Sequence, residues 1–195
     1  MLLKDITTCS TIAVKKLDEQ LIAEMNSIQP NLLVRIDDLK VEIGEGCHPW
    51  LQAPAKTSLK QAIAYAGRKL IINSAFRTLA GQMLLRKHFE NGACGILAAA
   101  EPGASNHNRA SAIDIEDADT WRSALEASGW RKLGNFDPMH YDCVSGRLQD
   151  IGKLSVIAFQ KLWNRHNPQD LIAVDGGFGA ETRQKLLDSP AEGWE

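Results

Sequence analysis

Two histidines and one aspartate in the second half of the chain are of the residue types that bind catalytic zinc. His107 lies in Ser105-Asn106-His107, Asp114 follows it seven residues later, and His140 comes further on. Two imidazoles and one carboxylate can hold Zn(II) and leave a fourth position open for water. The spacing allows a loop to carry His107 and a strand to carry Asp114. The sequence therefore predicts a metal site made of His107, Asp114 and His140.

Alternating polarity predicts the two strands that would present these ligands. Around Asp114, the neighbouring isoleucines occupy one face of a strand, and the carboxylate occupies the other. The same alternation groups Met139 with Tyr141 for packing and leaves His140 to point with Asp142. We expect the two strands to offer small or ligating side chains on one common face.

Three motifs, beginning at residues 74, 105 and 137, occur along the chain in the same order as in the zinc D-alanyl-D-alanine carboxypeptidase (VanY-like) family, which the sequence resembles. The family pattern S-x-H-x-x-G-x-A-x-D matches Ser105–Asp114, the pattern E/D-x-x-H matches Asp137–His140, and S-G/A-Y/F-R-T-x-x-x-Q matches Ser74–Gln82. The resemblance covers roughly residues 65 to 142. It implies one Zn(II) per chain, cleavage of peptides of bacterial cell-wall peptidoglycan, and a fold shared with the hedgehog signalling domain. The chain differs from the usual pattern in having Ala110 in place of glycine.

The resemblance also implies roles for residues around the metal. Asp137 stands where many members carry glutamate, and a carboxylate there can take a proton from water and pass it to the leaving amine. Arg77, at a predicted strand-to-helix turn, would hold or polarise the substrate, because a guanidinium suits a peptide carboxylate or carbonyl oxygen. Ser105 and Gln82 are the other predicted substrate-binding residues. Asp142 is a candidate for orienting a ligand histidine.

The composition is that of an ordinary globular protein and excludes several functions. The chain has 195 residues, 44% hydrophobic and 24% charged, with a formal net charge of −2. This charge gives no electrostatic argument for binding nucleic acid or an anionic membrane. No apolar run approaches the ~20 residues that span a bilayer. No export signal of the common secretory type is visible at the start, and we expect a monomer that acts on the cell wall.

The four cysteines permit disulfides without requiring them. They are Cys9, Cys47, Cys94 and Cys143, widely spaced and without a C-x-x-C motif, so a cysteine-rich zinc site is not indicated. A cysteine hydrolase that uses Cys94 or Cys143 with a histidine is an alternative, but neither cysteine lies in a recognisable nucleophile motif.

The remaining patterns predict an α+β fold, with a small antiparallel sheet and flanking helices. Helical spacing of apolar residues predicts helices over 12–28, 58–67, 78–90 and 121–128, and short strands are expected at 32–36, 41–43 and 69–73. Residues 1–146 would form the catalytic domain.

Residues 150–195 resemble a peptidoglycan-binding module. The matching residues are Phe159-Gln160 and the glycine turn Asp175-Gly176-x-Phe178-Gly179-x-x-Thr182, between helices predicted at 155–164 and 182–187. The alternative is a helical cap that packs on the catalytic domain.

Two functions from different classes remain open at this stage. The first is a zinc peptidase that cuts either the terminal D-Ala-D-Ala bond, as a carboxypeptidase, or an internal bond, as an endopeptidase. The second is a non-catalytic wall-binding or signalling module in which zinc only supports the fold. The proton-handling carboxylate of Asp137 favours the peptidase.

Overall fold

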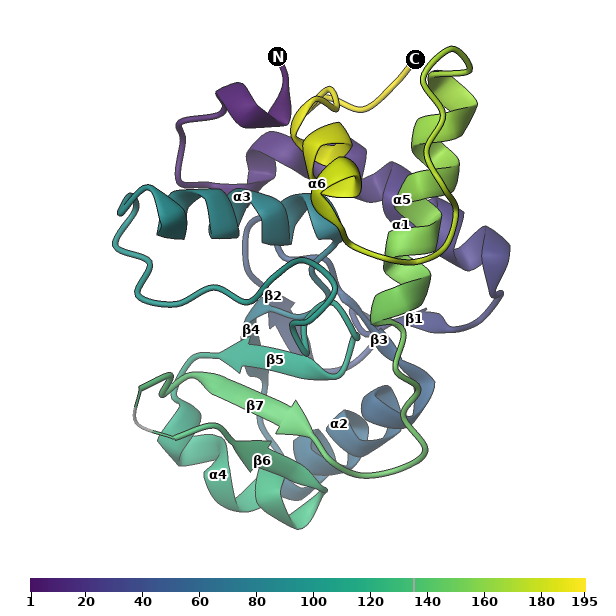
Figure 1. Cartoon of the computed structure of the whole chain (residues 1–195). Coiled ribbons are helices and arrows are strands. Elements are labelled where there is room, and N and C mark those ends of the chain that lie inside the picture. Colours follow the sequence, from purple (N-terminus) through teal and green to yellow (C-terminus); the bar gives the residue numbers. More distant parts are fainter. Residues whose placement is uncertain (135) are drawn as a thin grey trace. The chain divides into compact units, whose positions relative to one another are not determined.

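The computed structural model describes residues 1–134 and 136–195 and has the predicted α+β architecture (Figure 1). The chain forms two compact units, and each is assembled from stretches that are separate in the sequence. The first contains Met1–Pro30, Thr78–Asn108 and Ile151–Glu195, and the second contains Asn31–Arg77 and Arg109–Asp150. Among the described residues, no helix has the length and apolar character needed to cross a membrane.

The first unit is built of helices around one apolar core. Its elements are η1 (Leu3–Asp5), η2 (Thr11–Val14), α1 (Lys15–Ile28), α3 (Leu79–Glu90), α5 (Gly152–His166) and α6 (Ala180–Leu187). In α1, Leu17, Leu21 and Met25 are almost completely buried, as their helical spacing predicts. Phe159 and Leu186 contribute to the same core from the C-terminal helices. Each such side chain stabilises the fold by about 1.5–3 kcal/mol through burial.

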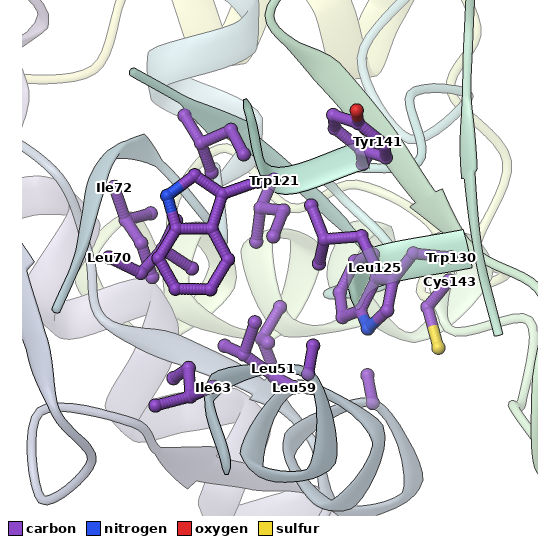
Figure 2. Packing of buried hydrophobic residues seen from close by; sticks show 14 of the residues in the cluster. Leu51, Leu59, Ile63, Leu70, Ile72, Trp121, Leu125, Trp130, Tyr141 and Cys143 are labelled. Carbon is purple, nitrogen blue, oxygen red and sulfur yellow. The ribbon is translucent and has the colours of Figure 1, made fainter. Parts of the chain in front are cut away.

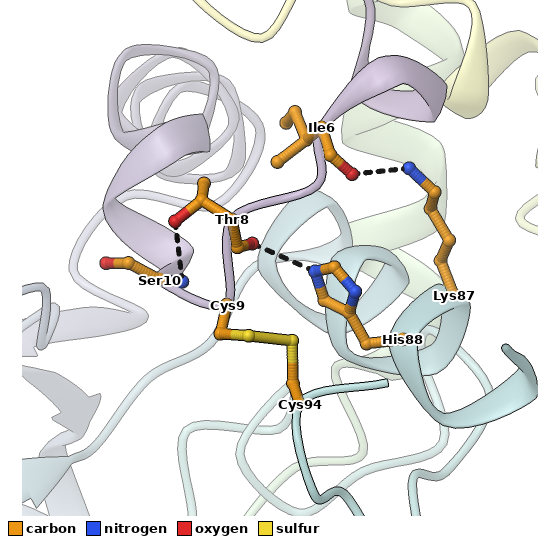
Figure 3. The surroundings of a disulfide bond; sticks show 7 residues. All are labelled: Ile6, Thr8, Cys9, Ser10, Lys87, His88 and Cys94. Carbon is orange, nitrogen blue, oxygen red and sulfur yellow. Dashed lines mark hydrogen bonds between the residues drawn. A yellow bond between two sulfur atoms is a disulfide. The ribbon is translucent and has the colours of Figure 1, made fainter. Parts of the chain in front are cut away.

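A disulfide between Cys9 and Cys94 ties the N-terminal segment of this unit to the residues that follow α3 (Figure 3). Beside it, His88 Nε2 lies 3.0 Å from the carbonyl oxygen of Thr8, and the Lys87 ammonium donates a hydrogen bond to the backbone. Because Cys94 is oxidised, it cannot serve as a thiolate nucleophile, which removes one form of the cysteine-hydrolase alternative. Cys143 is a buried thiol.

The second unit contains both sheets. Its elements are β1 (Leu33–Arg35), β2 (Val41–Ile43), β3 (Trp50–Gln52), α2 (Ala53–Ala66), β4 (Leu70–Ser74), β5 (Ala112–Ile115), α4 (Ala118–Ala127), β6 (Trp130–Lys132) and β7 (His140–Cys143). The main sheet has the strand order β2-β4-β5-β7-β6, and β1 pairs with β3 in a separate two-stranded sheet (Figure 1). The strands predicted to carry the ligands, β5 and β7, are therefore neighbours at the interior of the main sheet.

The register between β5 and β7 fixes which side chains share a face. Asp114 is paired with His140, and Ile113 is paired with Tyr141. Ile113 and Tyr141 are fully buried in the core that the sheet forms with α2 and α4 (Figure 2). Because side chains alternate along a strand, Asp114 and His140 point to the opposite face of the sheet. This confirms the face predicted from the alternation.

Several local predictions differ from the structure. Met139 is not packed inside but is 40% exposed, because it lies in the turn before β7. The helix predicted from residue 58 begins at Ala53, since proline is accepted in the first helical turn, where its missing N–H costs nothing. The strand β3 was not predicted, and the pair β2–β4 is parallel within a sheet otherwise antiparallel.

The C-terminal helices do not form a separate compact unit. Helix α5 packs against α1 and α3, helix α6 packs against α3 and α5, and all four share one hydrophobic core. A boundary between the compact units falls at Asp150 and Ile151, and the residues from Ile151 onward belong to the first unit together with Met1–Pro30 and Thr78–Asn108. A peptidoglycan-binding role of residues 150–195 stays a prediction.

Candidate metal centre

The three predicted metal ligands lie together in the structure. His107, Asp114 and His140 each offer a ligand atom, and these atoms lie within 4.8 Å of one another. Both histidines are buried, and the Asp114 side chain is 19% exposed.

His140 lies between two carboxylates. Its Nδ1 is 3.0 Å from Asp114 Oδ1, and its Nε2 is 2.9 Å from Asp142 Oδ1. Burial lowers the pKa of His140, but the hydrogen bonds and negative charges of Asp114 and Asp142 outweigh it and raise the pKa to about 9. Nδ1 faces Asp114, so it is the ring nitrogen of His140 that would hold a metal together with this carboxylate. Asp142 would then still accept a hydrogen bond from Nε2 and fix the orientation of the ring.

The chemistry and spacing of these donors fit a tetrahedral metal ion. Zinc binds histidine nitrogen and carboxylate oxygen at about 2.0–2.2 Å, which places neighbouring ligand atoms about 3.4 Å apart in a tetrahedron. Asp114 Oδ1 and His140 Nδ1 are 3.0 Å apart, and the ligand atoms of all three residues lie within 4.8 Å of one another. The spacing expected for a tetrahedral ion lies between these two distances. Small side-chain shifts would therefore suffice to bind the metal.

Arg77 places a positive charge beside the same carboxylate. It lies three residues after the end of β4, donates a hydrogen bond to Ser74 Oγ at 3.0 Å, and has Nη2 3.6 Å from Asp114 Oδ2. The guanidinium is 20% exposed, so it can also reach a ligand from solvent. Nearby, burial raises the pKa of the Cys47 thiol to about 12, which keeps this cysteine protonated at neutral pH.

The loop that carries His107 is held by its own polar groups. Ser105 Oγ accepts a hydrogen bond from the backbone N–H of His107 at 3.2 Å. Asn108 is completely buried, accepts from the Gly103 N–H at 2.9 Å and donates to the Thr78 carbonyl at 3.2 Å. Ser105 therefore has a visible role in shaping the loop, whereas substrate binding by its hydroxyl stays a prediction.

The backbone conformation of Ala110 accounts for the glycine in the family pattern at this position. Its φ is +50°, in the left-handed region that L-residues adopt at a cost of about 1–2 kcal/mol. The residue is fully buried, and its carbonyl accepts a hydrogen bond from the Gln52 N–H at 3.0 Å. The chain thus keeps the bend between His107 and β5 without the residue that adopts it most easily.

The two remaining predicted site residues differ in their surroundings. Asp137 is half-buried in the turn before β7, where its carbonyl accepts a hydrogen bond from the His140 N–H at 3.3 Å. Gln82 is buried in α3, and its Nε2 donates to the Ala100 carbonyl at 2.9 Å. This hydrogen bond of Gln82 supports the segment before the metal loop, and contact of Gln82 with substrate stays a prediction.

Two residues that support the site were not predicted from the sequence. Asn108 was overlooked because a single asparagine next to a histidine carries no distinctive pattern. Asp18 is buried in α1 and hydrogen-bonds the hydroxyl of Thr78, which caps α3 by accepting from Ala80 and Gly81. An acidic residue next to Leu17 in the apolar pattern of this helix was the available signal, since buried carboxylates need a partner.

Comparison with known families agrees with this arrangement. Residues 51–136 match the model of the VanY family, described as D-alanyl-D-alanine carboxypeptidase. The matched segment includes Arg77, Ser105, His107 and Asp114 and ends just before Asp137 and His140. No curated protein matches the chain. Residues 51–136 are thus similar to the VanY family of D-alanyl-D-alanine carboxypeptidases, which confirms the resemblance first seen in the motifs and is typical of a carboxypeptidase-type hydrolase.

Proposed function

We propose that this chain is a zinc-dependent peptidase that hydrolyses peptide bonds in the stem peptides of bacterial peptidoglycan. The observation that carries the proposal is that ligand atoms of His107, Asp114 and His140 lie within 4.8 Å of one another. The VanY match over residues 51–136 supports the class of reaction. The charge of Arg77, 3.6 Å from Asp114, supports an anionic or polarised substrate group at the same place.

His107, Asp114 and His140 are the residues that would hold the metal. When bound, zinc lowers the pKa of a water ligand to around 7 and polarises a carbonyl group. Asp142 orients the His140 ring through its 2.9 Å contact with Nε2. Arg77 already shares its charge with Ser74 and Asp114, so it is pre-positioned, and its planar fork can bind the carboxylate or carbonyl oxygen of the peptide.

Asp137 is the proposed general base and acid. It lies three residues before His140, and its backbone carbonyl accepts a hydrogen bond from the His140 N–H, so the turn holds the Asp137 backbone in a fixed relation to a predicted metal ligand. Its side chain would accept a proton from the attacking water and return it to the leaving amine nitrogen. A general acid–base residue of this kind contributes typically ~10²–10⁴-fold to the rate.

The disulfide bond supports the proposal that the protein acts outside the cytoplasm. The Cys9–Cys94 disulfide is of a kind that persists mainly in oxidising compartments. We propose in addition that residues 150–195 contribute to wall binding, as their glycine turn resembles that of a peptidoglycan-binding module. A non-catalytic, wall-binding protein with structural zinc is the competing function, and it would share both features.

The deciding experiment measures metal content and peptide cleavage on the same samples. The expected result is about one zinc per chain, release of D-alanine from a peptide ending in D-Ala-D-Ala, and loss of both in His107→Ala. His166→Ala is the matched control, because His166 stacks on Trp194 and belongs to no predicted site. Mass spectrometry of digested peptidoglycan then identifies the bond. Zinc binding without cleavage of any peptidoglycan bond would favour the structural-zinc alternative.

A further inference from the structure

One buried side chain closes the loop that carries His107. Asn108 is completely buried, its Oδ1 accepts a hydrogen bond from the Gly103 N–H at 2.9 Å, and its Nδ2 donates to the Thr78 carbonyl at 3.2 Å. The first bond joins the two ends of a short loop, residues 103–108, in which His107 lies. The second bond ties this loop to the residue that caps α3. Asn108 therefore fixes the backbone from which the His107 side chain extends.

The two bonds of Asn108 need the two halves of an amide group. The Gly103 N–H requires an acceptor and the Thr78 carbonyl requires a donor, and the asparagine side chain supplies one of each. Without this amide, residues 103–108 would lose both ties. The metal would then have to order the loop as it binds, and each ordered residue costs conformational entropy.

Thr78, to which Asn108 is tied, is itself held by a buried carboxylate. The Thr78 hydroxyl accepts from the N–H groups of Ala80 at 3.1 Å and Gly81 at 3.3 Å, and it donates its proton to Asp18 of α1. Asp18 is 1% exposed, and its carboxylate lies at the N-terminus of α3, where the helix dipole favours a negative charge. All these residues belong to the first unit. A continuous chain of hydrogen bonds thus runs from α1 to the loop that carries His107.

We propose that Asn108 is a positioning residue that sets the zinc affinity of the metal centre, and that Asp18 acts on it through Thr78. Together they hold the His107 loop in one conformation before the metal arrives, so that little ordering entropy opposes binding. The inference rests on the proposed function for the presence of zinc. It adds a determinant of affinity that lies outside the three predicted ligands.

The test measures the zinc Kd of the full chain by competition with a chelating dye. Asn108→Ala should raise the Kd roughly 10- to 100-fold, the usual effect of losing a group that holds a metal ligand in place. Asp18→Asn keeps the shape of the side chain but replaces a charge-assisted hydrogen bond by a neutral one, and it should raise the Kd roughly 3-fold. Asp18→Asn should also speed amide hydrogen exchange at Gly103 in the metal-free chain, because the change is transmitted through Thr78. This variant decides the test if Asn108→Ala does not fold.

Two controls separate positioning from general loss of stability. Asn164 also uses both halves of its amide, donating to the Ile172 carbonyl at 2.8 Å and accepting from the Ile172 N–H at 2.9 Å, but it holds the segment after α5, which carries no predicted ligand. Asn164→Ala should therefore lower the urea midpoint of the metal-free chain and leave the zinc Kd unchanged. Thr78→Ser retains the hydroxyl and should bind zinc like the unchanged chain, whereas Thr78→Val removes it at similar volume and should raise the Kd at least as much as Asp18→Asn.

The inference is overturned if Asn108→Ala, or Asp18→Asn in its place, binds zinc as tightly as the unchanged chain. It is also overturned if Asn108→Ala and Asn164→Ala raise the Kd by the same factor. Cleavage of a short D-Ala-D-Ala peptide by the unchanged chain is measured in parallel. Cleavage together with an unaltered Kd in these variants would refute the inference alone, and a raised Kd in a chain that cleaves no peptidoglycan bond would refute the peptidase alone. An unchanged chain that binds no zinc would refute both.

Discussion

In the metal-free protein, the most informative perturbation is a change of pH across the titration of His140. The pKa of this histidine is raised from 6.5 to about 9 by Asp114 and Asp142. Because the folded protein holds the proton more tightly than the unfolded chain, the stabilisation is fully present below about pH 6.5 and is lost as the pH rises through 9. About 2.5 pH units at about 1.4 kcal/mol each give a loss of about 3.5 kcal/mol.

The assay is urea unfolding of the chelator-treated chain at pH 6, 7, 8 and 9. Subtracting the values for His140→Gln removes the contribution of other titrating groups. Asp142→Asn should reduce the pH-dependent loss by roughly half, because it removes one of the two carboxylates that raise the pKa. Asp38→Asn is the control. Asp38 pairs with Lys56 on the surface, and because this pair lowers the pKa of Asp38, its carboxylate stays charged throughout this pH range.

The proton on the His140 ring competes with zinc for this histidine, so the pH dependence of zinc binding is an independent test of the raised pKa. Zinc binding requires neutral His140, so the apparent affinity should rise about tenfold for each pH unit between pH 7 and 9. The reasoning is refuted if the metal-free wild type and His140→Gln lose stability equally over this range. It is also refuted if NMR titration of the His140 ring gives a pKa near 6.5.

Three further predictions follow from single features. Asp137→Asn should keep zinc, measured by elemental analysis, but turn over at least ~10²-fold more slowly than wild type, whereas Asp137→Glu should retain part of the rate; wild-type turnover in Asp137→Asn would contradict the proposed role of Asp137. Ala110→Gly should change the unfolding free energy by less than about 1 kcal/mol, because relief of the positive φ offsets the loss of the buried methyl group. Ala62→Gly, in the middle of α2, should instead lower the unfolding free energy by about 2 kcal/mol. Reducing the Cys9–Cys94 bond, which closes a loop with a sequence separation of 85, should lower the unfolding free energy by up to about 4 kcal/mol, and an unchanged urea midpoint after reduction would contradict this.

The ligand face could be predicted from the sequence because it depends on a local rule. Alternation alone placed Asp114, His140 and Asp142 together on one face, and the register of β5 and β7 agrees with it. The same rule failed for Met139, because alternation holds only inside a strand and this residue lies in the turn before it. The position of a strand end depends on the turn that precedes it, which short patterns do not determine.

The supports of the metal loop could not be predicted, because they come from residues far apart in the chain. Asn108 reaches the carbonyl of Thr78, and Thr78 is bound in turn by Asp18. Each of these residues has a common local explanation as a loop or helix-end residue. Only the packing of α1 against α3 brings Asp18 to Thr78, and such pairing depends on the whole core of the first unit.

The shared core also changes how the C-terminal region must be tested. From the sequence, deletion of residues 150–195 should weaken wall binding and spare cleavage of short peptides. In the structure, Phe159, Leu162 and Trp163 of α5 belong to the same core as Leu79 and Leu84 of α3. Deletion would expose these residues of α3 and unsettle its first turn, where Thr78 accepts the hydrogen bond of Asn108. Loss of cleavage after deletion would then report unfolding of the first unit rather than a catalytic role of the tail, so substitutions of exposed residues of the tail, which leave this core intact, are the sound test of wall binding.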